Sequence, residues 1–246
     1  MTILVYDIRE RRMERFERGL RDAMPYANET LRVGEFRGSS RSELLWTTSA
    51  TMESWTAFRQ LWGRPIYLPY AFKRVGEGGH GQQSQHYAGT SFDCAQNLTA
   101  AGQAQMRQLA QASGLWTYVE PVYLTPTWVH FDRRINPPAC AAGGYPIQRH
   151  GSIGNYVCVL QDALNIAARA RLTIDGLFGR FTEDVLRRFQ ALNGLTADAV
   201  AGCNTWRLLM LQSVGRGSGV SGQEFAFGTV IEESPRDDSQ GDCFSG

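Results

Sequence analysis

Two short stretches of the sequence carry residue types that could bind a metal ion. In the first, residues 84–93, His86 and Asp93 are separated by six residues. In the second, residues 127–132, His130 stands two positions before an aspartate. A catalytic zinc site uses about three protein ligands, chosen from histidine, carboxylate and cysteine, and keeps one position for water. His86, Asp93 and His130 supply that number, so the sequence predicts a Zn²⁺ site if the fold brings the two stretches together.

The second stretch is expected to be a strand that follows Pro126. Successive side chains of a strand point to opposite faces, so His130 and Asp132 share a face, as suits a ligand with a carboxylate beside it. Zinc held by two imidazoles and one carboxylate polarises a peptide carbonyl and lowers the pKa of its bound water to roughly 7. Such a site would hydrolyse a peptide bond, and it needs a base to move the water's proton to the leaving amine.

The first stretch resembles the motif Ser-x-His-x-x-Gly-x-Ala-x-Asp of the zinc D-Ala-D-Ala carboxypeptidase and L-Ala-D-Glu endopeptidase family, which shares its fold with the hedgehog signalling domain. Ser91 stands where the family usually has alanine. The segment Trp-Val-His-Phe-Asp at residues 128–132 resembles the family's second motif. The matching residues of the first motif are Ser84, His86, Gly89 and Asp93.

This resemblance covers roughly residues 30–135. It implies an α+β fold with a hedgehog-like zinc peptidase domain, and a Zn²⁺ cofactor held by His86, Asp93 and His130. The implied activity is hydrolysis of the stem peptide of peptidoglycan, as a carboxypeptidase or an endopeptidase. The resemblance does not say which bond is cleaved.

The chain departs from the family pattern at the base. Many members have Glu or Asp three residues before the last histidine, where this chain has Thr127, whose hydroxyl cannot act as that base. Glu120, at the end of the preceding predicted strand, is the first candidate for the role, and Asp132 is the second. The missing acid also favours an alternative function, a non-catalytic wall-binding protein with a degenerate peptidase domain.

Two further residues are candidates for binding substrate. The family usually has an arginine at the end of a Ser-Gly-Tyr-Arg segment, and Arg74 lies in the corresponding place. A guanidinium pairs bidentately with a carboxylate, so Arg74 would bind a substrate carboxylate, unless it is an ordinary surface arginine. Ser84 of the metal motif is the other candidate. His80 and His150 have no partner ligands in the sequence and are left out of the ligand set, although His80 could line the cleft.

Helices and strands must position these residues. Apolar residues at helical spacing predict a helix around residues 52–62 that Gly63 ends, and a second helix is expected between the cap Thr99 and Gly114. Strands are expected at residues 115–120 and 127–132, and an edge strand at residues 65–72, where prolines lie near both ends. Shorter extended pieces are predicted at residues 3–6 and 30–33, with residues 9–12 as a hairpin tip.

The second half has a different pattern. Helical spacing after Gly154, a turn with two glycines at residues 172–179, a helix capped by Thr182 and a short helix opening at residues 204–206 follow one another. This order resembles the three-helix peptidoglycan-binding domain of many cell-wall hydrolases and implies peptidoglycan as a partner. Exposed candidates for wall contact are Asp175, Phe178, Arg180 and Asn204.

The predicted domain organisation has four parts. Residues 1–135 form the catalytic domain, residues 136–150 are a linker rich in proline and glycine, and residues 151–212 form the binding domain. Residues 213–246 have few apolar residues and no periodicity, so we expect disorder there.

Composition limits the partners and the location. The chain has 25 basic and 24 acidic residues and a net charge of +1, which argues against nucleic-acid binding by bulk electrostatics. No apolar run has the length of a membrane span, and residues 1–7 lack the features of a signal peptide. We expect a monomer that acts on the cell wall or outside the cell, reached by export or lysis.

Five cysteines are present without a Cys-x-x-Cys pair, so a zinc site made of thiolates is not expected. Cys94 is expected to be a small buried residue. A disulfide between Cys140 and Cys203 would tie the linker to the binding domain, but spacing alone leaves the pairing open.

Overall fold

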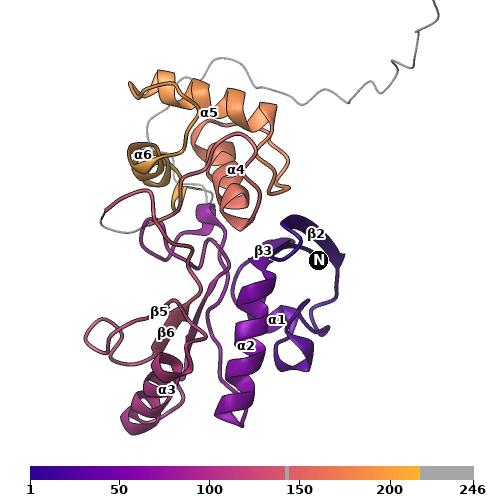
Figure 1. The fold of residues 1–246 in the computed structure, drawn as a ribbon, viewed down its shortest axis with the longest axis vertical. Coiled ribbons are helices and arrows are strands. Elements are labelled where there is room, and N and C mark those ends of the chain that lie inside the picture. The colour runs from indigo at the N-terminus through magenta and orange to yellow at the C-terminus, as the bar shows by residue number, and fades with distance from the viewer. Residues whose placement is uncertain (142–143, 217–246) are drawn as a thin grey trace, which may run out of the picture.

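The computed structural model describes residues 1–141 and 144–216 and has a mixed α+β architecture. Two small sheets with their helices form the first half of the chain, and three further helices lie together at the upper end of the view (Figure 1). One continuous apolar core runs through both parts. The α+β class is as predicted, whereas the specific hedgehog-like fold stays a prediction. No helix in the described part of the chain is long and apolar enough to cross a membrane.

The first sheet has the order β2-β1-β3. Strands β1 (Thr2–Asp7) and β2 (Arg12–Glu17) form an antiparallel hairpin whose tip is the charged turn expected there, and β3 (Leu44–Thr48) pairs with β1 in parallel. The predicted extended piece at residues 30–33 is confirmed only for Leu31 and Arg32, whose backbone is extended and of which Arg32 forms an isolated bridge with Ala23. On either side of these two residues lie η1 (Asn28–Thr30) and α1 (Val33–Arg37), and the Glu35 side chain caps the N-terminus of α1.

The two predicted helices of the first half are confirmed. Helix α2 (Ser49–Trp62) begins after the cap Thr48 and ends at Gly63, and helix α3 (Ala100–Ser113) begins after Thr99. In both, the cap hydroxyl accepts a hydrogen bond from a backbone N–H of the first turn, which satisfies one of the unpaired donors there. Their buried faces cover the two sheets.

The second sheet carries the predicted metal residues. Its order is β4-β6-β5, with all strands antiparallel, where β4 is Ser91–Cys94, β5 is Tyr118–Val119 and β6 is Val129–Asp132. The strand predicted at residues 65–72 does not form and makes only an isolated bridge beside β4. Two prolines in that segment cannot donate a ladder hydrogen bond, so pairing with β4 stays local.

The second half contains α4 (Asn155–Ala167), α5 (Arg180–Leu192) and α6 (Cys203–Ser213). The predicted cap at Thr182 is wrong, because α5 begins two residues earlier. Thr182 is buried instead, and its hydroxyl accepts a hydrogen bond from Gln161 on α4. Of the predicted tail, residues 214–216 continue from α6, and residues 217–246 lie outside the described residues.

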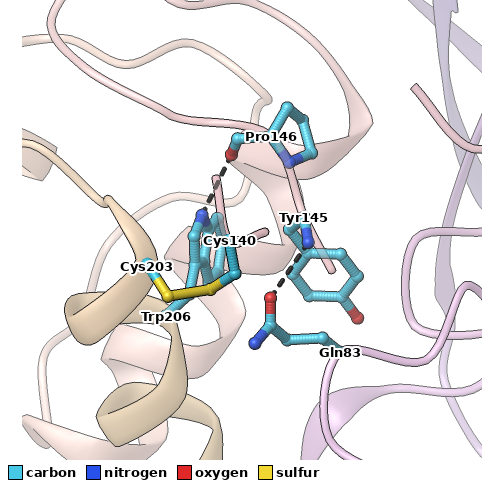
Figure 2. Close-up of a disulfide and its surroundings, with 6 residues drawn as sticks. All are labelled: Gln83, Cys140, Tyr145, Pro146, Cys203 and Trp206. Atoms are coloured by element: carbon cyan, nitrogen blue, oxygen red, sulfur yellow. Dashed lines mark hydrogen bonds between the residues drawn. A yellow bond between two sulfur atoms is a disulfide. The ribbon is translucent and has the colours of Figure 1, made fainter. Parts of the chain in front are cut away.

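The predicted linker packs against both parts of the molecule. Cys140 and Cys203 form a disulfide with an S–S distance of 2.07 Å, so the pairing that spacing left open is present (Figure 2). Tyr145 is fully buried, and its backbone N–H donates to Gln83 of the first half (Figure 2). Trp206 of α6 donates from its indole N–H to the carbonyl of Pro146. Residues 142–143 lie outside the described residues.

Candidate metal centre

Strand pairing brings the two predicted metal stretches together. In the register of β4 and β6, Asp93 lies directly opposite His130. One carboxylate oxygen of Asp93 lies 2.6 Å from Nδ1 of His130, and the other lies 3.2 Å from Nε2 of His86. The three residues thus converge on the Asp93 carboxylate, although 37 positions separate Asp93 from His130 in the sequence.

A glycine makes the turn between His86 and β4. Gly89 has φ +67°, a conformation that L-residues rarely adopt, and a Cβ on it would collide with the carbonyl oxygen of Trp46. The Thr47 hydroxyl donates to the Gly89 carbonyl at 2.7 Å. The glycine of the motif is therefore required by close contact with β3, and it places His86 and Asp93 on either side of one tight loop.

His86 has the hydrogen-bond pattern of a metal ligand. Its ring is buried, and Nδ1 lies 3.0 Å from the carbonyl oxygen of Ala71. A carbonyl can only accept, so Nδ1 carries the hydrogen and the lone pair is on Nε2, which has no hydrogen-bond partner among the described residues. A buried lone pair that faces a carboxylate at 3.2 Å fits a cation placed between the two.

His130 is held by a second carboxylate. Its Nε2 lies 3.3 Å from Asp132, which is fully buried and receives the guanidinium of Arg134. Histidine ligands of metals usually donate their other N–H to a carboxylate in this way, and here Asp132 holds the His130 ring so that Nδ1 is on the side of Asp93. The predicted shared face of His130 and Asp132 on β6 is confirmed, since the two side chains are in contact.

The electrostatics also favour a cation. Burial alone would raise the pKa of Asp93, but the rings of His130 and His86 beside its carboxylate outweigh burial and hold that pKa below its usual value. Burial lowers the pKa of His130, whereas its bonds to Asp132 and Asp93 raise it to about 9. Two buried carboxylates around one imidazole thus attract positive charge, and the donor set of two imidazole nitrogens and one carboxylate suits Zn²⁺.

Sequence reasoning left His80 out, yet it lies at this site. Its ring stacks on His86 with centroids 4.2 Å apart, and ligand atoms of His80, His86 and Asp93 lie within 4.8 Å of one another. Burial, and then the neighbouring His86, lower the pKa of His80 to about 4, so its ring is neutral and can offer a lone pair. The glycine-rich loop around His80 has no periodicity, so no pattern in the sequence predicts where its ring points.

A cavity of about 290 Å³ opens beside these residues. Glu120 lines it, held by a backbone hydrogen bond to His130 at 2.9 Å and by Arg107, which donates to its carbonyl. Among the described residues the Glu120 carboxylate has no hydrogen-bond partner, whereas that of Asp132 is occupied by Arg134 and His130. Of the two candidate bases, Glu120 is therefore the one with a free carboxylate at the cavity. We name this space the Glu120 cavity.

The two candidate substrate-binding residues lie in different places. Ser84 lines the Glu120 cavity, and its hydroxyl accepts from the backbone N–H of His86 at 3.3 Å. Arg74 does not line it. Its guanidinium donates to both carboxylate oxygens of Asp162 on α4 and stacks on Trp46, so the structure does not bring it together with the metal residues. The arginine that does line the cavity is Arg134.

The candidates for wall contact also divide. Phe178 was predicted to be exposed and is buried, because its ring belongs to the core shared with α4 and α5. The Asp175 carboxylate receives hydrogen bonds from Gln161 and from the backbone of Leu177, which shape the turn before α5. Arg180 and Asn204 are exposed.

Comparison with known proteins finds a family match within the second half of the chain. Residues 154–209 match the family model described as "Putative peptidoglycan binding domain". The chain matches none of the curated proteins with which it was compared. A solved structure, "Crystal structure of Burkholderia AP3 phage endolysin", shares 48% sequence identity over 26% of this chain and 24% of that chain, with a TM-score of 0.25. The chain thus aligns with about a quarter of that structure's length. Residues 154–209 are a peptidoglycan-binding domain, which supports peptidoglycan as a partner of the chain.

Proposed function

We propose that this chain is a zinc-dependent peptidase that cleaves the stem peptide of peptidoglycan and is directed to the wall by residues 154–209. One observation carries the proposal. Nε2 of His86 is buried without a hydrogen-bond partner among the described residues, and it faces the same carboxylate that contacts Nδ1 of His130. Buried polar atoms usually have a partner, and a Zn²⁺ ion bound here would supply one to Nε2.

His86, Asp93 and His130 would hold Zn²⁺, which supplies Lewis acidity for a peptide carbonyl and a lowered pKa for water. Asp132 and Arg134 keep the His130 ring in place, so its Nδ1 stays directed at the site. Glu120 accepts the proton of the attacking water and passes it to the leaving amine. A free carboxylate in the cavity can do this, whereas Asp132 would first have to break its bonds to Arg134.

The binding domain adds proximity. Attachment to the wall raises the local concentration of stem peptides, so the catalytic cavity need not bind its substrate tightly. We propose the cell wall as the place of action, because the substrate is there.

A second candidate function is that of a non-catalytic wall-binding protein. It is favoured by Thr127, which stands where the resembling family carries an acid. In that case the metal would be structural, and Glu120 would have no role in a reaction.

Zinc content tests the metal assignment. Purified protein should contain about one zinc per chain, and His86→Ala and Asp93→Ala should lose it in elemental analysis. His150→Ala is the matched control, because this exposed histidine pairs only with Glu183 on α5 and should leave the zinc content unchanged. Full occupancy in both site variants would overturn the assignment.

Digestion of purified sacculi separates the two functions. The peptidase should release soluble fragments whose masses identify the cleaved bond, and the wall-binding alternative should bind sacculi and release nothing.

A further inference from the structure

A second cavity, of about 510 Å³, adjoins the metal residues. His80, Asp93 and Trp128 line both this space and the Glu120 cavity, so the two meet at the metal residues. We name it the Lys73 cavity. Its other lining residues are Ser39, Tyr70, Lys73, Gly79 and Gln96.

Lys73 is the only lysine of the sequence, in which the 25 basic residues are otherwise arginine. Its backbone N–H donates to the carbonyl of His86 at 3.2 Å, which fixes Lys73 beside residues 84–90. We name residues 84–90 the metal loop. The neighbouring Arg74 turns to Asp162 on α4, while Lys73 lines the cavity. Among the described residues no carboxylate pairs with the Lys73 ammonium, which is therefore available to an anion.

Gln96 adds a second polar group. Its Oε1 is buried and has no hydrogen-bond partner in the described part of the chain. A buried acceptor without a donor costs free energy unless a ligand supplies one, and a peptide N–H is such a donor. Trp128 and Tyr70 provide the aromatic surface of the cavity. An ammonium, an amide acceptor and aromatic rings together fit a peptide that carries a carboxylate.

We propose that the Lys73 cavity is a substrate subsite that adjoins the metal residues, separate from the Glu120 cavity, and that Lys73 binds a carboxylate of the stem peptide there. The inference rests on the proposed peptidase function. Because Asp93 lines both cavities, a peptide bound across the metal residues would occupy the Lys73 cavity as well as the Glu120 cavity. The carboxylate can come from an acidic residue within the peptide or from its C-terminus, since the ammonium recognises either.

Protection from chemical modification tests binding without requiring turnover. Reductive methylation with formaldehyde and a borane modifies amines, so in this protein it labels only Lys73 and the N-terminus. A synthetic stem peptide in its free-acid form should slow methylation of Lys73 severalfold and leave the N-terminal rate unchanged. Equal rates with and without saturating peptide would overturn the proposal.

Kinetics with three peptides identify the carboxylate. For the free-acid peptide, Lys73→Met should raise KM about tenfold, the loss expected for one charge-assisted hydrogen bond, and Lys73→Arg should restore most of it. Amidation of the internal carboxylate, or of the C-terminal one, should remove the difference between wild type and Lys73→Met, and the peptide that does so names the source. A difference that survives both amidations would contradict carboxylate binding by Lys73.

Arg64→Met is the matched control, because this exposed cation lies over Trp62 and lines neither cavity. It should leave KM and the methylation rate of Lys73 unchanged. The zinc content of Lys73→Met should equal that of the wild type. If the wild-type protein itself contains no zinc or cleaves none of the peptides, that result contradicts the proposed peptidase function and not the subsite.

Discussion

At the scale of single residues, the site depends on which ring nitrogen of each histidine carries hydrogen. Ala71 fixes the hydrogen of His86 on Nδ1, and Asp132 is placed to hold that of His130 on Nε2. Nε2 of His86 and Nδ1 of His130 then both face Asp93. The outer partners, a carbonyl and a carboxylate, therefore matter nearly as much as the ligands, because they orient the rings before any metal arrives.

Asp132→Asn tests this role. An amide can still contact His130, but it withdraws the negative charge that makes the ring a better ligand, so zinc affinity should fall about 10- to 100-fold. Competition with a chelator of known affinity measures the change. Arg134 loses its carboxylate partner in this variant, so a thermal melt must show that the protein remains folded. Unchanged affinity in a folded variant would mean that Asp132 has no part in the site.

Glu120→Gln tests the base. Zinc content should stay at the wild-type level, because Glu120 contributes only its backbone to the position of His130. Release of fragments from sacculi should fall about 10²- to 10⁴-fold, the usual contribution of a general base. If release persists at the wild-type rate, another group moves the proton, and Asp132 is the remaining candidate near His130.

At the scale of elements, the sequence predicted helix ends, which depend on residues close in the chain, better than strand pairing, which depends on distant residues. Helix α3 begins and ends at the residues expected and α2 ends at the expected Gly63, because caps and C-terminal glycines act within one turn, whereas α2 begins at Ser49, earlier than its apolar pattern indicated. The segment at residues 65–72 has the composition of a strand, but whether it pairs with β4 depends on distant backbone. For the same reason the sequence could not predict which of Lys73 and Arg74 would line a cavity.

The proposed metal ligands were easier to predict than the cavity around them. Two motifs name His86, Asp93 and His130, and the structure brings all three together. His80 and Gln96 lie in segments without periodicity, and their side-chain directions follow from the packing of separate elements. No spacing rule connects such residues, so they could be found only from the folded chain.

The turn at Gly89 allows a prediction for an element. Gly89→Ala should lower the free energy of unfolding by about 1–3 kcal/mol or more, because the backbone is strained and the Cβ collides with β3, and zinc affinity should fall as the loop shifts. Gly63→Ala is a matched control. Gly63 has φ +72° but open space around it, so Gly63→Ala introduces only backbone strain, and this variant should keep the zinc affinity of the wild type. Thermal melts with and without zinc compare the two, and equal losses would show that the contact with Trp46 is unimportant.

At the scale of the whole molecule, the binding domain supports the metal loop directly. Tyr156 on α4 donates from its hydroxyl to Gln85 at 2.7 Å, and Asn155 donates to the carbonyl of Ala88 at 2.8 Å. Both acceptors lie next to His86 or within three residues of it. The apolar core is continuous across the junction, and the disulfide ties the connecting segment to α6. The two halves therefore form one packed unit, which a flexible tether would not produce.

The ion pair between Arg74 and Asp162 carries the last prediction. Asp162 is 4% exposed and Arg74 is 25% exposed, so Asp162→Asn leaves a largely buried guanidinium without its counter-charge. The free energy of unfolding should fall by about 2–3 kcal/mol, below the range for fully buried pairs because Arg74 keeps some contact with water. Asp184→Asn on α5 is the control: its pairs with Arg180 and Arg187 are on the surface, and its loss should cost about 0–1 kcal/mol.

Chemical denaturation followed by tryptophan fluorescence and circular dichroism measures both variants. Because Arg74 belongs to the first half of the chain and Asp162 to the peptidoglycan-binding domain, Asp162→Asn should shift one common transition, with both parts unfolding together. The zinc affinity of Asp162→Asn should also fall. Asp162 accepts hydrogen bonds from Arg74 and Val75, and the adjacent Lys73 donates from its backbone to His86, so a shift of this segment would move His86. Two separate transitions, with only one of them moved, would show that the halves are stable independently and that the junction does not support the metal loop.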